Sequence, residues 1–217
     1  MKLHTLMILI VAGLVLFSAT TQAADKNWLV RGRILNVNPN DKSGSITGIP
    51  GSGVSVDSDT TLELDFTYFF TPNWGAELIL GTSEHNLNGA GSIAALGKIG
   101  SAKTLPPTVT AVYQFAPSAS VRPYAGIGIN YTSFYDEKTS SSLNAALGST
   151  TAELGSSWGL AGQAGVDIDI TKDWFINFDA KYIQMDTAIT LNSSGTIRKV
   201  NVDLNPWFVG LGIGTRF

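Results

Sequence analysis

The sequence predicts an all-β protein, an eight-stranded antiparallel transmembrane β-barrel with long extracellular loops and short periplasmic turns. Three observations lead to this expectation. Eight segments alternate side chains with period two, the pattern of strands with two different faces. The connecting segments are alternately long and short. The more hydrophobic face carries Leu, Phe and Trp whereas the other carries carboxylates and glycines, which is the reverse of a soluble barrel with a side-chain core.

The first 23 residues are predicted to be a cleaved secretory signal peptide. Lys2 precedes twelve apolar residues, Leu6 to Phe17, and small residues then lead to Ala23. A basic start, an apolar run and a small-residue cleavage site are typical of such a leader, whereas a membrane-spanning helix needs about 20 apolar residues. Cleavage leaves one domain, residues 24–217, with a net charge near −4 and no basic patch that suggests nucleic acid. It has no cysteine, so packing or a membrane must hold it together.

The strands can be placed from the alternation. We expect them at roughly 28–36, 58–70, 74–82, 107–116, 121–133, 157–170, 174–186 and 202–217. The long connections are then 37–57, 83–106, 134–156 and 187–201, and the short ones 71–73, 117–120 and 171–173. An even number of strands puts both termini on the periplasmic side. Within 134–156, the stretch SSLNAALGSTTAELG favours a short helix.

The last strand ends in GLGIGTRF, residues 210–217. A barrel has no free edge only if its last strand pairs with its first, so we expect this strand to be regular to its final residue. Gly210, Gly212 and Gly214 are expected to face inward, where little side-chain volume fits, and Phe217 to face the lipid. Aromatic residues near the short-turn ends are assigned to an interfacial girdle: Phe69, Phe70, Trp74, Phe115, Tyr124, Trp174, Phe175 and Phe217.

Four stretches resemble the OmpW family of outer-membrane proteins in order and spacing. They are PPTVTAVYQF (106–115), RPYAGIGINYT (122–132), SWGLAGQAGVD (157–167) and NPWFVGLGIGTRF (205–217), although Asn205 stands where the family usually has Asp before Pro-Trp. The resemblance implies a barrel in the bacterial outer membrane with a narrow, largely hydrophobic passage, linked to uptake of small hydrophobic molecules. Some members serve as receptors for toxins or phage.

The expected partners follow from the resemblance. They are outer-membrane lipid and lipopolysaccharide, a small hydrophobic ligand, and the barrel-assembly machinery, for which Phe217 resembles the terminal sorting signal. The protein is expected to be a monomer.

The inward face divides into a charged and an apolar part. Eleven charged residues are predicted to form an ion-paired plug near the periplasmic end, because charges in a narrow lumen are costly unless paired: Arg31, Arg33, Glu63, Asp65, Glu77, Arg122, Asp167, Asp169, Asp179, Lys181 and Arg216. Further up, apolar residues are predicted to line the lumen: Leu35, Ala161, Ile183, Met185, Leu204 and Phe208.

This division predicts a funnel open to the extracellular side. An apolar molecule entering it gains about 25 cal/mol per Å² of buried apolar surface. It cannot pass the plug without losing that gain, so the simplest exit is sideways between strands into the membrane. The alternative is a structural or adhesive barrel that acts through its extracellular loops.

We expect neither an enzyme nor a cofactor. Ser83, Glu84 and His85 are adjacent in a long loop, a placement that rarely brings a Ser–His–acid triad together. His85 is the only histidine after the leader and there is no cysteine, so no transition-metal site is expected.

Overall fold

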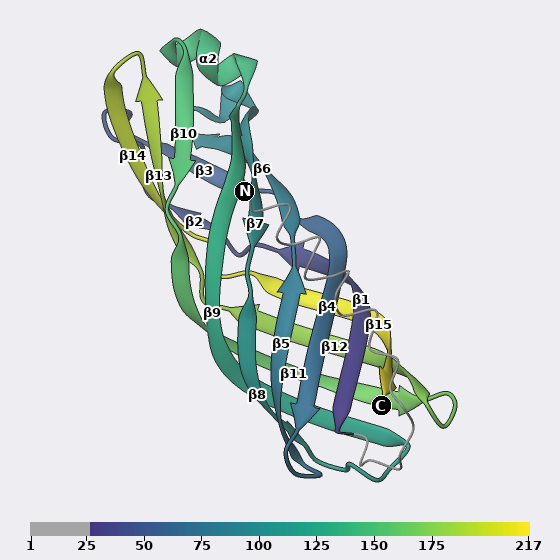
Figure 1. Ribbon diagram of the computed structural model, residues 1–217. Helices are drawn as coiled ribbons and strands as arrows, with labels where there is room; N and C mark the ends of the chain where they lie inside the picture. The colour runs from purple at the N-terminus through teal and green to yellow at the C-terminus, as the bar shows by residue number, and fades with distance from the viewer. Residues whose placement is uncertain (1–26) are drawn as a thin grey trace, which may run out of the picture.

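The structure is a computed structural model that describes residues 27–217, so the predicted signal peptide lies outside the described residues. Figure 1 shows one elongated barrel of strongly tilted strands. Its eight main strands are β1 (Trp28–Asn38), β4 (Asp59–Phe69), β5 (Trp74–Gly81), β8 (Thr108–Gln114), β9 (Val121–Thr139), β11 (Ser157–Asp169), β12 (Trp174–Ile183) and β15 (Trp207–Arg216). They pair antiparallel in the order β11-β12-β15-β1-β4-β5-β8-β9, and β9 pairs with β11 to close the barrel. The predicted eight-stranded fold is confirmed. No helix within residues 27–217 is long and apolar enough to span a membrane.

The first and last strands pair along their whole length. The register runs from Leu29 opposite Arg216 to Asn38 opposite Trp207. The ladder continues to the last residue, because Phe217 and Trp28 exchange two backbone hydrogen bonds of 3.0 and 3.1 Å. The terminal strand is therefore regular to its end, as barrel closure requires.

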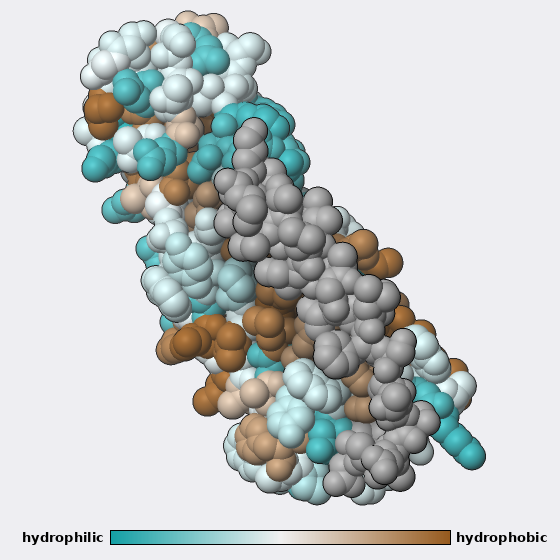
Figure 2. Space-filling view, viewed as in Figure 1, coloured by the Kyte–Doolittle hydropathy of each residue, from teal (hydrophilic) through white to brown (hydrophobic). Residues whose placement is uncertain are grey.

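The outer and inner faces have the predicted orientation. Leu64, Leu160 and Leu211 point outward with exposed fractions of 43%, 62% and 52%. Asp167 and Arg122 point inward and are buried. Figure 2 shows hydrophobic side chains around the middle of the barrel wall and mostly hydrophilic ones at the long-loop end. This surface is suited to lipid around its middle and to water above it.

The inward glycines of β15 leave room for neighbouring side chains. An added Cβ at Gly214 would overlap the ring of Phe175 and lie 2.8 Å from the carbonyl oxygen of Val30. One at Gly212 would lie 2.7 Å from Cγ of Arg33. Both contacts are far shorter than van der Waals separation, so these positions require glycine for packing.

The Gly214→Ala variant should therefore be less stable by about 1–3 kcal/mol, because Phe175 must move out of its site. Unfolding by urea in lipid vesicles, followed by tryptophan fluorescence, measures the change. Gly162→Ala on β11 is the matched control, since an added Cβ there meets nothing within 4 Å, and it should change stability by less than about 0.5 kcal/mol. Equal effects of the two variants would contradict the packing role.

Two aromatic girdles surround the barrel, and the predicted one was partly wrong. Phe69, Tyr124 and Phe175 are buried inside, with exposed fractions of 9%, 2% and 1%. Each lies an even number of residues from the inward charged residues of its strand. This alternation, rather than closeness to a turn, decides on which face of the barrel wall a side chain lies. The other five members, Phe70, Trp74, Phe115, Trp174 and Phe217, are exposed as expected.

The second girdle, here called the outer girdle, lies towards the long-loop end, and the one at the short turns is called the inner girdle. It contains the ring pairs Tyr131–Trp158 and Tyr182–Trp207, with centroids 4.8 and 5.2 Å apart. The nine residues from Trp174 to Tyr182 span about 26 Å along β12. A strand tilt of about 35–45° makes this about 20 Å along the barrel axis, close to the apolar band of about 25 Å in outer-membrane barrels.

The four long connections are not irregular loops, contrary to expectation. They contain β2 (Lys42–Ser43), β3 (Ser52–Val56), β6 (Ser83–Gly91), β7 (Lys98–Leu105), β10 (Thr150–Leu154), β13 (Asp186–Ser193), β14 (Thr196–Asp203) and the 3-10 turn η1 (Ala94–Leu96). The expected short helix is present as α2 (Ser141–Leu147), and the Oγ of Ser140 caps its first turn by accepting from the Leu143 N–H.

These strands extend the barrel wall beyond the outer girdle. β3, β6 and β7 continue the main sheet from β9, and β10, β13, β14 and β2 form a second sheet opposite them (Figure 1). Their inner faces enclose a core of buried aliphatic residues such as Ile46, Val54, Leu143, Leu191 and Val202. Gly- and Ser-rich composition concealed these strands because it is typical of loops, whereas burial of one face against the opposite sheet stabilises them here.

Candidate functional site

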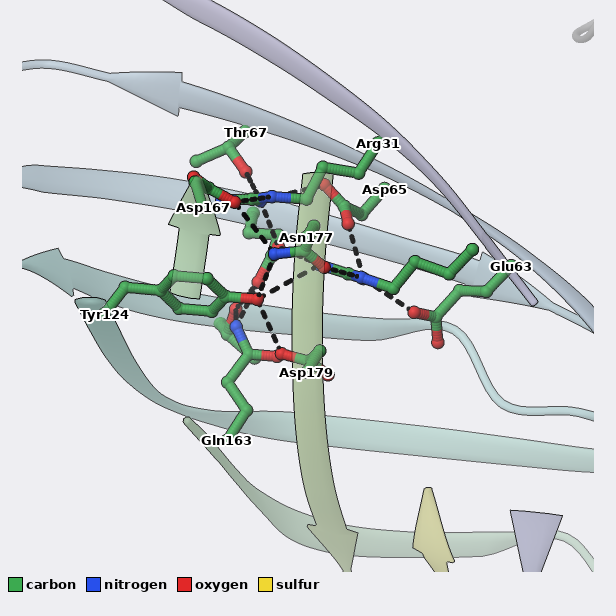
Figure 3. A network of polar contacts seen from close by, with 12 residues as sticks. Arg31, Glu63, Asp65, Thr67, Tyr124, Gln163, Asp167, Asn177 and Asp179 are labelled. Atoms are coloured by element: carbon green, nitrogen blue, oxygen red, sulfur yellow. Dashed lines mark hydrogen bonds and ion pairs between the residues drawn. The ribbon is translucent and has the colours of Figure 1, made fainter. Parts of the chain in front are cut away.

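A buried polar network fills the barrel between the inner girdle and its middle (Figure 3). It contains eight of the predicted plug residues, namely Arg31, Arg33, Glu63, Asp65, Glu77, Asp167, Asp179 and Lys181, each at most 5% exposed. They come from β1, β4, β5, β11 and β12, so the network joins strands around the barrel. Three cations face five carboxyl groups, and the cations are shared so that each carboxyl group has at least one of them within 4 Å. Contact with an opposite charge offsets part of the cost of burying these groups.

Arg31 is the centre of this network. Its Nε and Nη2 donate to the two carboxylate oxygens of Asp167 at 3.0 and 2.9 Å, a bidentate pair. Its Nη1 lies 3.2 Å from oxygens of Asp65 and Glu77. The guanidinium also lies over the Tyr124 ring at 4.8 Å from its centroid, which adds a cation–π contact.

Arg33 and Lys181 form the upper layer. Arg33 Nη1 lies 2.7 Å from Glu63 Oε1 and 2.5 Å from Asp65 Oδ2. Lys181 Nζ donates to Glu63 Oε1 at 2.8 Å and to Asp179 Oδ1 at 2.9 Å. Both cations have a carboxylate partner and are 2% exposed, and we call this buried layer the charged floor.

The other three predicted plug residues lie below this layer, at the short-turn rim. Arg122 forms a bidentate pair with Asp169, but the Asp169 side chain is 35% exposed. Asp169 therefore belongs to the rim and not to the buried interior, because it is the last residue of β11. Arg216 donates to the Gln114 Oε1 at 2.9 Å.

Uncharged members of the network were not foreseen. Tyr124 donates through its hydroxyl to Asp179 Oδ2 at 2.7 Å, and Asn177 donates through Nδ2 to Asp167 Oδ1 at 2.8 Å. Gln163 and Thr110 both donate to Glu77 Oε2. All four alternate in step with the other inward residues of their strands. The sequence therefore identifies them as inward residues if uncharged polar residues are counted along with charged ones.

An apolar cavity lies above the floor, among the outer strands. It has about 520 Å³ of unfilled space, including the part open to solvent. Three of the six predicted lumen residues, Met185, Leu204 and Phe208, line it. Ala161 is buried in the same aliphatic cluster without lining either cavity.

A second, smaller cavity lies directly above the charged floor. It has about 340 Å³ of unfilled space, including the part open to solvent. Leu35 and Ile183, the remaining predicted lumen residues, line it together with Lys181 and Glu63. Phe208 lines both cavities. Its side chain therefore lies between the upper and the lower space.

The lower cavity reaches a break in the strand pairing of the barrel wall, here called the gap. β5 and β8 pair from Trp74 opposite Tyr113 to Ile79 opposite Thr108, and β6 and β7 resume the same register at Ser83 opposite Thr104. Between them, the residues 80–82 and 105–107 form no paired register. Pro106 and Pro107 have no N–H to donate across this gap, and Gly81, Thr82 and Pro106 line the lower cavity beside it.

Ser83 and His85 contact each other, which the sequence did not lead us to expect. Ser83 Oγ lies 2.8 Å from His85 Nε2, and His85 Nδ1 lies 2.7 Å from the backbone oxygen of Asp57. The third group is thus a carbonyl and not a carboxylate, and the Glu84 carboxylate points outward, 3.9 Å from Lys103. A Ser–His–acid triad is not formed by these residues.

Surface charges beyond the outer girdle form a separate group. The ammonium groups of Lys103 and Lys138 lie 2.8 and 3.0 Å from Asp136 Oδ2. Hydrogen bonds from these two lysines lower the pKa of the Asp136 carboxyl, and the bond to Asp136 raises the pKa of Lys103. These side chains are exposed, so the pairs contribute little stability.

A closed antiparallel barrel with a lipid-facing exterior, two aromatic girdles and an ion-paired interior is an outer-membrane β-barrel. The comparisons with known proteins identify which kind. The OmpW family model matches residues 25–217, and the chain belongs to this family.

The relatives agree with this assignment. The chain is similar to Outer membrane protein W of Escherichia coli K12, with 36% identity over the full length of both chains. It is also 28% identical to the dibenzothiophene metabolism operon protein PahQ of Pseudomonas aeruginosa, covering 92% of this chain and 93% of that protein. The crystal structure of OprG from Pseudomonas aeruginosa matches with a TM-score of 0.81 and 34% identity, covering 88% of this chain and 95% of OprG.

Proposed function

We propose that this protein takes up small apolar molecules through the outer membrane. They enter the extracellular cavity, pass Phe208 into the lower cavity and leave sideways through the gap between β5 and β8. The observation that carries the proposal is the place of Phe208, which lines both cavities and so lies between two spaces above the charged floor. The name of the relative PahQ, which refers to the metabolism of an apolar aromatic compound, supports it.

The charged floor favours the sideways exit. An apolar molecule gains about 25 cal/mol per Å² while it is buried in the upper part, but passage through the floor requires the ion pairs of Lys181 and Glu63 to separate. Breaking a buried pair costs several kcal/mol. The gap beside Pro106 and Pro107 has no such pairs, and we propose that it opens towards the lipid, where the molecule stays in an apolar environment.

Replacing Phe208 with Asp should lower uptake of radiolabelled naphthalene into proteoliposomes by at least roughly tenfold, a barrier increase of about 1.4 kcal/mol. A carboxylate between the two cavities keeps water around it and interrupts their apolar lining. Ile183→Asp, Met185→Asp and Leu204→Asp should act in the same direction.

Ile197→Asp is the matched control, because Ile197 is exposed at the outer end of β14. It should leave uptake unchanged if the molecule passes through the lumen. Folding of each variant is checked by the heat-dependent shift of the barrel in SDS gels. Unchanged uptake in all four folded lumen variants would overturn the proposal and favour a barrel that acts through its extracellular surface.

The roles of this protein in assembly and lipid contact, and its oligomeric state, remain predictions. We propose that Phe217 is the signal read by the barrel-assembly machinery, supported by its exposed ring at the end of β15. We also propose that the protein acts as a monomer, without enzymatic activity, in contact with lipid and lipopolysaccharide. The exposed apolar side chains around the whole wall support the lipid contact.

A further inference from the structure

The apolar upper cavity has three polar side chains in its wall. They are His85 on β6, Thr104 on β7 and Thr187 on β13, and the other lining residues are aliphatic, aromatic or proline. All three polar residues are buried. A molecule in this cavity therefore meets few hydrogen-bonding groups, and their direction decides which molecules are accepted.

The directions of the hydrogen bonds follow from one carbonyl group. The backbone oxygen of Asp57 can only accept, so His85 Nδ1 carries the hydrogen of the 2.7 Å bond. In the neutral ring, Nε2 is then an acceptor, and Ser83 Oγ donates to it at 2.8 Å. With its own hydrogen used, Ser83 Oγ accepts from the Thr104 hydroxyl at 2.8 Å. The Thr104 hydrogen is thus turned away from the cavity.

Thr187 is arranged in the same way. Its hydroxyl donates to the backbone oxygen of Gly155 at 2.8 Å. Every side-chain hydrogen on nitrogen or oxygen in this wall is therefore bound by the protein, and only oxygen lone pairs remain for a ligand. Pro39 and Pro206, which also line the cavity, have no N–H.

We propose that this cavity selects apolar molecules that carry a hydrogen-bond donor, such as a phenol or an alcohol, over ethers of the same size. The inference rests on the proposed function and specifies its substrate class. A hydroxyl on the ligand donates to Thr104 or Thr187, whereas an ether oxygen is buried without a partner, which costs free energy.

The test compares 2-naphthol with 2-methoxynaphthalene, which lacks the donor. Binding to the full chain in lipid nanodiscs is measured by fluorescence titration at pH 8, with empty nanodiscs to subtract partition into lipid. We expect the wild type to bind 2-naphthol roughly tenfold more tightly than the ether, the effect of about one hydrogen bond.

The Ser83→Ala variant should reduce this preference to below roughly threefold, because the Thr104 hydroxyl then turns to donate to the ether. Ser101→Ala is the matched control, a buried serine on β7 outside the cavity lining, and it should keep the wild-type ratio. A second variant, Thr104→Val, should weaken 2-naphthol binding and leave ether binding as it is.

The outcomes separate the two proposals. Equal binding of both probes by the wild type, or an unchanged preference in Ser83→Ala and Thr104→Val, would overturn the selection by a donor and leave uptake intact. Absence of binding above that of empty nanodiscs for both probes would instead contradict the apolar cavity of the proposed function.

Discussion

Replacement of Arg31 by methionine should lower the free energy of unfolding by about 3–5 kcal/mol or prevent folding, since it leaves buried carboxylates without their cation. Asp167 would lose both hydrogen bonds of its bidentate pair, and no other cation of the described residues lies within 4 Å of it. Glu77 would lose its closest cation, at 3.2 Å. Because these carboxylates come from β5 and β11, repulsion would act between opposite parts of the wall.

Urea unfolding in lipid vesicles and the heat-dependent shift in SDS gels measure this effect. Arg31→Lys should give an intermediate loss, since an ammonium group keeps the charge but not the two parallel bonds to Asp167. Lys172→Met is the matched control for loss of a cation, because Lys172 is exposed in the turn between β11 and β12. Wild-type stability of Arg31→Met would show that the ion-paired floor does not hold the barrel together.

A disulfide across the wall gap should stop lateral release. Continuing the register of the flanking strands through the unpaired segment sets Leu80 across from Pro107. A disulfide between these positions requires Cα atoms within about 7 Å of each other and so holds the two segments together. In Leu80→Cys/Pro107→Cys, oxidation should lower uptake of labelled naphthalene by roughly tenfold, a barrier increase of about 1.4 kcal/mol. Reduction should restore it. The natural chain has no cysteine, so these thiols have no competitors.

The control pair is Ala76→Cys/Ala111→Cys. These residues are opposed in the intact part of the same β5–β8 ladder, so their disulfide adds a bond without closing a gap, and uptake should not respond to oxidation. If the Leu80/Pro107 disulfide forms and uptake is unchanged, the molecule does not leave between β5 and β8. Folding is tested in the same samples, so a loss of structure is not mistaken for a closed gap.

The period-two pattern predicted which residues of the site lie on the inner face of the barrel. It placed Arg31, Asp65 and Lys181 on the inner face because parity within a strand is fixed by the pleat. It did not show that Asp169 lies at the rim, because the end of a strand is decided by the turn that follows. The girdle members Phe69 and Phe175 were misplaced when closeness to a turn was preferred to parity.

The wall beyond the outer girdle was not predictable in the same way. β13 and β14 are stabilised by Ile189, Leu191 and Val202 packing against the opposite sheet, and contacts between residues far apart in sequence leave no local pattern. The register gap at Pro106 and Pro107 is likewise visible only once β5 and β8 are paired.

The sequence by itself determined the class of protein, the eight main strands and the face of most of their residues, since an alternation of lipid-facing and inward side chains is a local property of every strand. Only the tertiary structure decided which charges pair, where the two cavities lie and which way the hydroxyl groups of the upper cavity point. Those features depend on the register between strands and on distances of a few ångströms across the lumen. Alternation along one strand carries no information about either.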